Sequence, residues 1–344
     1  MVGRGAMVRA MDARANTGRE FRDDERHRKA LPPDVVKRLT RLDPLKSWLS
    51  VAETVGLLAV FVAAGLHWWT PWVVVPMMVL IAGRQQACIV LAHEAAHYRL
   101  FNTRPLNDLI GRMAGGVVGI SMCAYRVVHR LHHNHLYEAQ DPDIPLNGGY
   151  PRGRAYLLKK LGKDLFGFTA YKTYAYFFGT PALNDDAEAA NRPLDDTSPE
   201  LRHAARQDRW FVAGFHVAAP ALAFWAGYGI EYMVLWALPL VTVLQPLLRF
   251  RAVCEHGAVR DFSSPLTAAR TNFAPFWLHW WMFPHNVNYH VEHHLYPSIP
   301  QYNLAECHRE MMALGILDGA EVRGVLETAR MVLADPETAP ATGS

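Results

Sequence analysis

Four apolar runs, arranged as two closely spaced pairs, constrain the fold of this 344-residue chain more than any other feature. The runs are residues 51–69 and 72–91 in the first pair, and 210–228 and 232–248 in the second. The hydrocarbon core of a bilayer takes about 20 apolar residues of helix, which is close to the length of each run. The turn inside each pair is only a few residues long. We therefore expect an all-α integral membrane protein whose four transmembrane helices form two hairpins.

The sequence also predicts which side of the membrane each part occupies. Arg249 and Arg251 follow the fourth run, as the positive-inside rule expects of a cytoplasmic end. Two hairpins return the chain to the side on which it started, so we place both termini in the cytoplasm, at a bacterial inner membrane. The expected parts are a basic N-terminal arm at 1–47, a membrane domain at 48–308 and a C-terminal tail at 309–344.

The basic arm contains no long apolar run, so we do not expect a secretory signal in it. Its arginines suit attraction to anionic lipid headgroups or to an acidic partner protein. We expect no nucleic-acid partner. Residues 106–125 and 164–178 are amphipathic or broken by charges, and we expect helices there that lie on the membrane surface.

One charged residue interrupts the second apolar run. Arg84 is followed by two glutamines, and an ionised side chain at membrane depth usually faces the interior of the bundle or a polar group of the substrate. An arginine paired with a backbone carbonyl, or one that reaches toward the membrane surface, fits the sequence equally well. The role of Arg84 stays open at this stage.

Eight of the seventeen histidines fall in three short boxes. The boxes are His-x-x-x-His at 93–97, His-x-x-His-His at 129–133 and His-x-x-His-His at 290–294. On a helix, residues at i, i+3 and i+4 share one face. Imidazole is a good ligand for iron, copper, zinc and nickel. The two-hairpin topology brings all three boxes to the same side, so we expect a histidine-rich metal centre in a cytosolic helical cap.

Two functions of other classes also fit parts of this pattern. The first box reads His-Glu-Ala-Ala-His, which matches the His-Glu-x-x-His signature of zinc peptidases, with Glu94 as the general base. A tetrahedral zinc takes three or four protein ligands, so this reading leaves most of the other boxes without a role. A non-catalytic metal-binding membrane protein is the second alternative. The four cysteines lie far apart and form no zinc-ribbon or iron–sulfur motif.

The three boxes and the hairpins resemble the integral-membrane fatty-acid desaturase and hydroxylase superfamily, over roughly residues 51–308. The run Tyr-His-Val-Glu-His-His-Leu-Tyr-Pro-Ser-Ile-Pro at 289–300 looks especially like the third box of sphingolipid-type and bacterial acyl desaturases. The second box, followed by Asp-Pro-Asp at 141–143, is also similar to the family's pattern. The Asn-Tyr-x-x-His-Tyr-Gly pattern of alkane monooxygenases is not found in this sequence.

The resemblance implies a site with two iron ions. Its ligands would be the eight box histidines, which are His93, His97, His129, His132, His133, His290, His293 and His294. Members of the superfamily commonly have a ninth ligand after the fourth span, where this chain has His256, with His135 as the runner-up. Glu94, Asp141 and His135 are candidates to hydrogen-bond the ligand imidazoles.

The expected reaction is the oxygen-dependent desaturation of a fatty acyl-type lipid chain, with dioxygen as co-substrate. Hydroxylation, ketolation or alkene-forming decarboxylation of a lipid at the same centre is the alternative. The sequence contains no dinucleotide, iron–sulfur or haem motif, so the electrons must come from a ferredoxin, rubredoxin or cytochrome-type donor. We expect an apolar tunnel between the four spans to lead the chain to the irons. The sequence does not indicate the substrate-binding residues.

Overall fold

The structure is a computed structural model that describes residues 30–138, 141–179, 199–259 and 261–336. Most of the predicted basic arm and the last eight residues of the tail lie outside this part. The described chain is mostly helical. Its strands, β1 (Thr271–Phe273) and β2 (Val322–Gly324), pair in parallel, with Thr271 opposite Val322. This small sheet is a departure from the all-α fold that we expected.

Three stretches of helix in the described part of the chain are long and apolar enough to cross a membrane. They are α4 (Pro44–His67), α5 (Pro71–Ala96) and the stretch Gly229–His256. The last of these is composed of α12 (Gly229–Tyr232), the π-helix η1 (Met233–Ala237), α13 (Leu238–Val241) and α14 (Leu244–His256). Both α4 and α5 begin with a proline. Proline is tolerated at the first position of a helix, because the backbone N–H group that it lacks would have no partner within the helix there.

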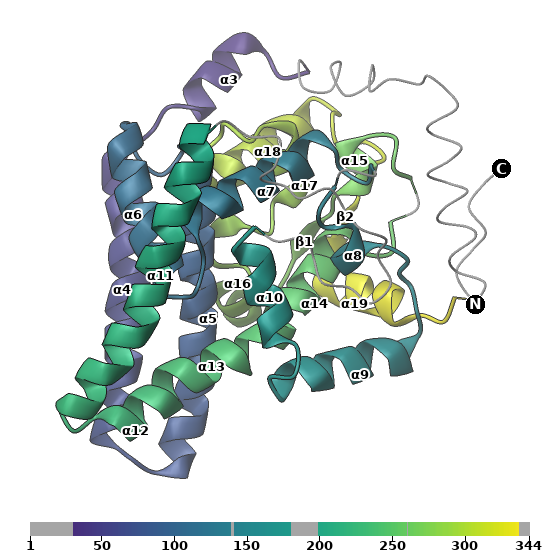
Figure 1. Ribbon diagram of the computed structural model, residues 1–344. Coiled ribbons are helices and arrows are strands. Elements are labelled where there is room, and N and C mark those ends of the chain that lie inside the picture. Colours follow the sequence, from purple (N-terminus) through teal and green to yellow (C-terminus); the bar gives the residue numbers. More distant parts are fainter. Residues whose placement is uncertain (1–29, 139–140, 180–198, 260, 337–344) are drawn as a thin grey trace.

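Residues 210–225 of the predicted third run lie in α11 (Pro199–Trp225), which begins earlier than the run and is more polar. Its N-terminal half carries Arg206, Asp208 and Arg209 among other charges. Buried Asp208 accepts the Cys123 backbone N–H at 2.6 Å and pairs with Arg112, so this half of α11 is fastened to neighbouring helices. Figure 1 shows α11 beside α6 and the other long helices, and α12 follows it after a tight turn.

Helix α5 is at the centre of the fold. Its residues from Ile81 to Ala96 are all buried, because α4, α6 (Arg104–Gly116), α7 (Met122–Asn134) and α14 surround it. A Cβ atom added at Gly111 of α6 would lie 2.6 Å from the Ala95 Cβ atom, so the two helices approach closely at this glycine. This burial fixes the C-terminal end of α5, where the first histidine box begins.

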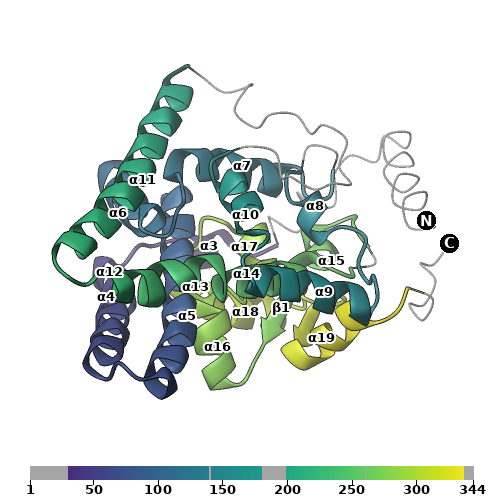
Figure 2. The same ribbon diagram turned by 60° about the horizontal axis from the view of Figure 1, so that its bottom comes forward.

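Most of the remaining elements lie to one side of the long helices (Figures 1 and 2). Their bounds are α3 (Pro33–Leu39), α8 (Ile144–Asn147), α9 (Arg154–Leu165), α10 (Ala170–Phe177), α15 (Pro265–Ala268), α16 (Phe276–Met282), η2 (Pro284–Asn286), α17 (His290–Leu295), η3 (Gln301–Asn303), α18 (Leu304–Ala313) and α19 (Val325–Leu333). The expected single helix at 106–125 is divided between α6 and α7, because Gly119 adopts a φ of 86° between them. The expected helix at 164–178 is likewise divided, between the end of α9 and α10, with Gly167 at a φ of 78°.

Arg84 is fully buried inside the bundle and forms an ion pair. Its Nη1 lies 2.8 Å from the Glu53 Oε1 atom, and its guanidinium lies 3.9 Å from the centre of the Trp280 ring. It also donates to the Trp280 carbonyl oxygen. These contacts join α4, α5 and α16, so Arg84 has a structural role that needs no substrate.

Candidate metal centre

The structure brings all three histidine boxes together, along with His256 from the end of α14. The nine imidazoles form two groups, and within each group the ligand atoms lie within 4.8 Å of one another. The first group is His93, His97, His129, His133 and His293, and the second group is His132, His256, His290 and His294. The groups adjoin, since the rings of His133 and His294 stack with centroids 4.3 Å apart.

Helical geometry decides how the second and third boxes are divided between the two groups, whereas both histidines of the first box belong to the first group. Successive residues on an α-helix are about 100° apart, so on their shared face residue i+4 lies about 40° to one side of residue i and residue i+3 about 60° to the other side. On α7, His129 and His133 belong to the first group and His132 to the second. On α17 the division is reversed: His290 and His294 belong to the second group and His293 to the first. Each of these short helices therefore contributes to both groups.

The distances between neighbouring imidazole nitrogens fit ligands of a shared metal ion. In the first group, Nε2 of His129 lies 2.9 Å from Nε2 of His97 and 3.0 Å from Nε2 of His133. In the second group, Nε2 of His256 lies 2.8 Å from Nε2 of His290 and 3.2 Å from Nε2 of His132. Two nitrogens bound about 2.1 Å from one ion at right angles would lie about 3.0 Å apart. The donor sets therefore fit two ions with nitrogen ligands.

The outer nitrogens of several imidazoles are bound by neighbouring groups. Nδ1 of His132 lies 2.9 Å from Asp141 Oδ1, and Nδ1 of His256 donates to the Ala268 carbonyl oxygen at 3.0 Å. Glu94 lies 3.3 Å from Nδ1 of His93 and accepts the Gln301 backbone N–H at 3.0 Å. Such contacts fix the orientation of a ligand imidazole and leave its Nε2 for a metal.

Burial determines the protonation of the box histidines. It lowers the pKa values of His129, His133, His293 and His294 well below their ordinary range, and the neighbouring imidazoles lower them further. Neutral imidazoles have a lone pair to give to a metal. His132 differs: burial lowers its pKa, but the carboxylates of Asp141 and Asp143 outweigh burial and raise it to about 9.

Some neighbours of the histidines were not predicted from the sequence. Tyr125 stacks on His129 with ring centroids 5.4 Å apart, and the Tyr176 hydroxyl donates to Asp143. Both are aromatic residues on helices and resemble ordinary core residues in the sequence. His135, the runner-up for the ninth ligand, lies outside both groups and pairs with Glu138 at 2.8 Å.

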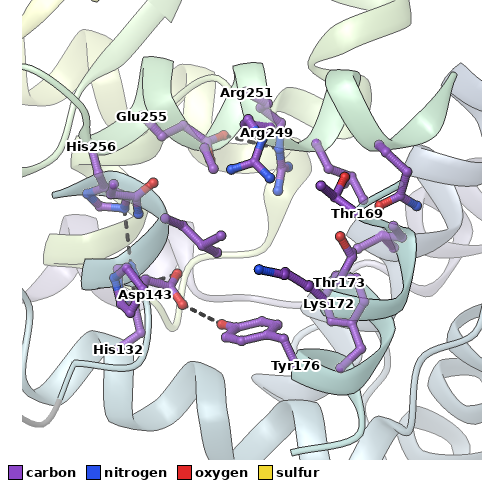
Figure 3. Close-up of a pocket in the computed structure, with 18 of the residues that line it drawn as sticks. His132, Asp143, Thr169, Lys172, Thr173, Tyr176, Arg249, Arg251, Glu255 and His256 are labelled. Carbon is purple, nitrogen blue, oxygen red and sulfur yellow. Dashed lines mark hydrogen bonds and ion pairs between the residues drawn. The ribbon is translucent and has the colours of Figure 1, made fainter. Parts of the chain in front are cut away.

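A cavity of about 170 Å³, here called the histidine-side cavity, opens directly against both histidine groups. Figure 3 shows it between α7, α10 and α14, with His132 and His256 at one side. The other lining residues include several ionisable ones, of which Lys172 and Arg251 lie across the cavity from each other. The short helices α8, α9 and α10 form part of the lining, and the membrane-length helix α5 and the end of the stretch Gly229–His256 form much of the rest.

A second cavity, an apolar groove of about 530 Å³, runs between α4, α5, α6, α11 and α12. None of the nine histidines lines it. Cys88 and Leu91 of α5 face this groove, whereas Ile89 and His93 on the opposite face of α5 line the histidine-side cavity. From the sequence we expected an apolar tunnel between the spans that leads to the histidines. The cavity that reaches the histidines instead has mixed polar walls, because the segments at 141–179 fold over the centre.

Long apolar helices surround two adjoining groups of histidines. This arrangement is typical of a membrane-associated, metal-binding protein. The family model for fatty acid desaturases matches residues 67–322, which include all three boxes and His256. The chain therefore belongs to the fatty acid desaturase family.

Three curated relatives show the range of substrates named in this family. A dihydrorhizobitoxine desaturase of Bradyrhizobium elkanii is 25% identical over 293 residues, which cover 81% of this chain and 79% of the relative. An sn-1 oleoyl-lipid 12-desaturase of Synechocystis is 23% identical, covering 80% and 79%. A chloroplastic sn-2 acyl-lipid omega-3 desaturase (ferredoxin) of Helianthus annuus is 26% identical, and the match covers 79% of this chain but 63% of the plant protein.

Proposed function

We propose that this protein is an oxygen-dependent desaturase that inserts a double bond into a lipid or lipid-like substrate. The observation that carries the proposal is the convergence of nine histidines into two adjoining groups in a chain that belongs to the fatty acid desaturase family. Two of the relatives, which are named as acyl-lipid desaturases, support the same reaction class.

The nine histidines would hold two iron ions, five as ligands of one and four as ligands of the other. Imidazole suits iron, and a set of nitrogen donors without thiolates fits it better than a structural zinc site. Bound iron would supply the reduction of dioxygen and the removal of hydrogen from an unactivated C–H bond. Asp141, Glu94 and the Ala268 carbonyl would hold their imidazoles in the orientation that binding requires.

The protein's own part in the reaction is to place two adjacent carbons against the histidine groups and to limit water there. Tyr125 and Ile89 line the histidine-side cavity close to the metal ligands and present apolar surface to a substrate. Hydroxylation, ketolation and alkene-forming decarboxylation need the same centre and remain the alternative reactions. These reactions differ from desaturation in where the reacting carbon of the substrate lies relative to the histidine groups.

The zinc peptidase alternative fits the structure poorly. Its general base, Glu94, is buried and already contacts His93 and the Gln301 N–H. A peptidase base must instead reach a metal-bound water. His93 and His97 also have three further histidine neighbours in their group, more than one tetrahedral zinc needs.

Several finer parts of the proposal concern the membrane and the partners. We propose that α11 completes a second hairpin with the stretch Gly229–His256, which gives four spans, and that the histidines face the cytoplasm of a bacterial cell. The domain limits would then be 1–47, 48–308 and 309–344. An external ferredoxin, rubredoxin or cytochrome would deliver electrons, and the name of the Helianthus annuus relative includes ferredoxin.

Product analysis tests the proposed function. The full-length protein, purified in detergent and loaded with iron, would be supplied with a reduced ferredoxin, oxygen and a mixed lipid extract. We expect a product that has lost two hydrogens and gained no oxygen, and no such product from the His293→Ala variant. A product that has gained an oxygen atom would favour hydroxylation, and an unchanged extract would contradict the proposal for lipids.

A further inference from the structure

Two of the nine histidines are only half-buried, and both belong to the first group. They are His97, which follows the end of α5, and His133 of α7, whereas all four histidines of the second group are buried. Neither of the two lines the histidine-side cavity, which is lined by His93 and His129 of the same group. The first group therefore has an edge, here called the His97–His133 edge, that is separate from the cavity.

Arginines lie close to this edge. Arg126 of α7 donates to the carbonyl oxygens of the last two residues of α5 at 3.2 Å, which places its guanidinium beside the start of the loop that carries His97. Its guanidinium also lies 4.2 Å from the centre of the Tyr98 ring, and that of Arg104 lies 5.3 Å from the same centre. Two positive charges therefore share one aromatic ring next to His97.

Two further arginines extend the positive charge along the edge. Arg99 is the second residue after His97, and its buried Nε atom has no hydrogen-bond partner among the described residues. Arg130 is exposed on α7 and precedes His133 by less than one helical turn. Both half-buried imidazoles are thus close to an arginine in the chain. We call the set of Arg99, Arg104, Arg126 and Arg130 the arginine patch.

The charge of the arginine patch is only partly neutralised. Arg126 pairs with Asp108 at 2.6 Å, and none of the other three arginines forms an ion pair with a residue that the structure describes. Positive surface of this kind steers a partner of opposite charge toward it. Arginine and tyrosine are also enriched at protein–protein interfaces. The patch with Tyr98 therefore has the composition of a docking surface for an acidic protein.

The proposed desaturation draws electrons from outside the protein. Removal of two hydrogens from the substrate, with reduction of one dioxygen to two waters, consumes two further electrons and two protons. A one-electron carrier is therefore oxidised twice per turnover, and the solvent supplies the protons. Electron transfer slows steeply with distance, so the carrier must dock where a histidine group comes close to the surface. The His97–His133 edge is such a place, because its imidazoles are half-buried and do not line the cavity.

We propose that the arginine patch is the docking surface for a small acidic electron-transfer protein, which delivers electrons through the His97–His133 edge while the substrate occupies the histidine-side cavity. This inference rests on the proposed function and names where its electron donor binds. Donor and substrate then approach the first group from different sides, so neither blocks the other. Electron-transfer partners form small, transient interfaces, which suits a patch of a few side chains.

Binding of an oxidised plant-type [2Fe–2S] ferredoxin to the full-length, iron-loaded protein tests this inference without turnover. The protein is held in nanodiscs of phosphatidylcholine, which has no net charge to compete with the ferredoxin. We expect binding that weakens by about tenfold between about 20 mM and 200 mM salt, because salt screens the charges of the patch. A basic cytochrome c of similar size should not bind. Equal binding of both carriers, or no salt-sensitive binding of the ferredoxin, would overturn the inference.

Variants locate the docking surface. Arg104→Gln combined with Arg130→Gln removes two exposed charges of the patch and should weaken ferredoxin binding by about tenfold. Arg126 is left intact, because it joins α7 to the end of α5. The matched control is Arg154→Gln combined with Lys163→Gln, which removes two exposed charges of α9, on the other side of the molecule from α6 (Figures 1 and 2). Unchanged binding in the folded patch variant, or an equal loss in the control, would overturn the inference.

The same proteins separate this inference from the proposed function. Lipid desaturation together with ferredoxin binding that is as tight in the patch variant as in the wild type would sustain the proposed function and overturn the docking surface. Patch-dependent ferredoxin binding by a protein that desaturates no lipid would sustain the docking surface and overturn the proposed function.

Discussion

Nε2 of His132 lies 3.2 Å from Nε2 of His256, although 124 residues separate the two histidines in the sequence. Helix α7 provides one of them and the end of α14 the other. Their outer nitrogens are bound by Asp141 and by the Ala268 carbonyl oxygen. The pair is therefore oriented from both sides toward one point, which we assign to the second metal ion.

His256→Ala tests the ninth ligand. It removes one of the four donors of the second group, so we expect metal content to fall from about two ions per chain to about one. His135→Ala is the control, because His135 pairs with Glu138 outside both groups. Metal analysis of the purified variants gives the answer. Full metal content in His256→Ala together with loss in His135→Ala would reverse the assignment.

Asp141→Asn tests the contact that orients His132. The amide is nearly the same size as the carboxylate but lacks its charge, so we expect metal affinity to fall by about 10–100-fold. A competition titration with a chelator measures this change. Glu138→Gln, a similar change on the same loop beside His135, should leave the affinity unaltered. Equal affinities in both variants would show that Asp141 does not act on the metal site.

Gly111→Ala tests the close approach of α5 and α6. The new methyl group would lie 2.6 Å from the Ala95 Cβ atom, so we expect a loss of about 1–3 kcal/mol in stability from overpacking. Gly162→Ala in α9 meets nothing within 4 Å and should be neutral or slightly stabilising. Thermal unfolding in one detergent compares the two variants. A stable Gly111→Ala protein would contradict the packing described for α5.

Arg84→Met tests whether Arg84 is structural. The change removes the Arg84–Glu53 ion pair and the contact with Trp280. Because the Glu53 side chain is 39% exposed and still accepts the Trp280 N–H, we expect a loss of about 1–3 kcal/mol in stability. Adding Glu53→Gln should restore part of that stability, because the unpaired charge is then gone. Normal stability in Arg84→Met with a changed substrate preference would instead give this arginine a role in binding.

The sequence predicted the convergence of the histidines, because helical spacing and a hairpin topology are local properties. It also indicated His256, which follows directly from the end of a long apolar run. The division of the second and third boxes between two groups could have been derived from the angle of about 100° between successive helical residues. It becomes evident only when the neighbouring boxes are in place.

The walls of the histidine-side cavity could not be predicted in this way. Lys172 and Arg251 are ordinary charges in the sequence, and their positions depend on how α9 and α10 fold back over α14. The Ala268 carbonyl that binds His256 is a backbone atom without a sequence signal. The expected apolar tunnel to the histidines stays a prediction: the apolar groove between the long helices does not include the histidines among its lining residues, and the cavity beside them has mixed walls.

The most direct test of the central claim is the metal content of the purified full-length protein, with His132→Ala and His293→Ala prepared alongside. The two substitutions remove one ligand from each group. We predict about two iron ions per chain in the wild type and loss of metal in both variants. About one zinc ion per chain, retained in both variants, would contradict the two-iron centre.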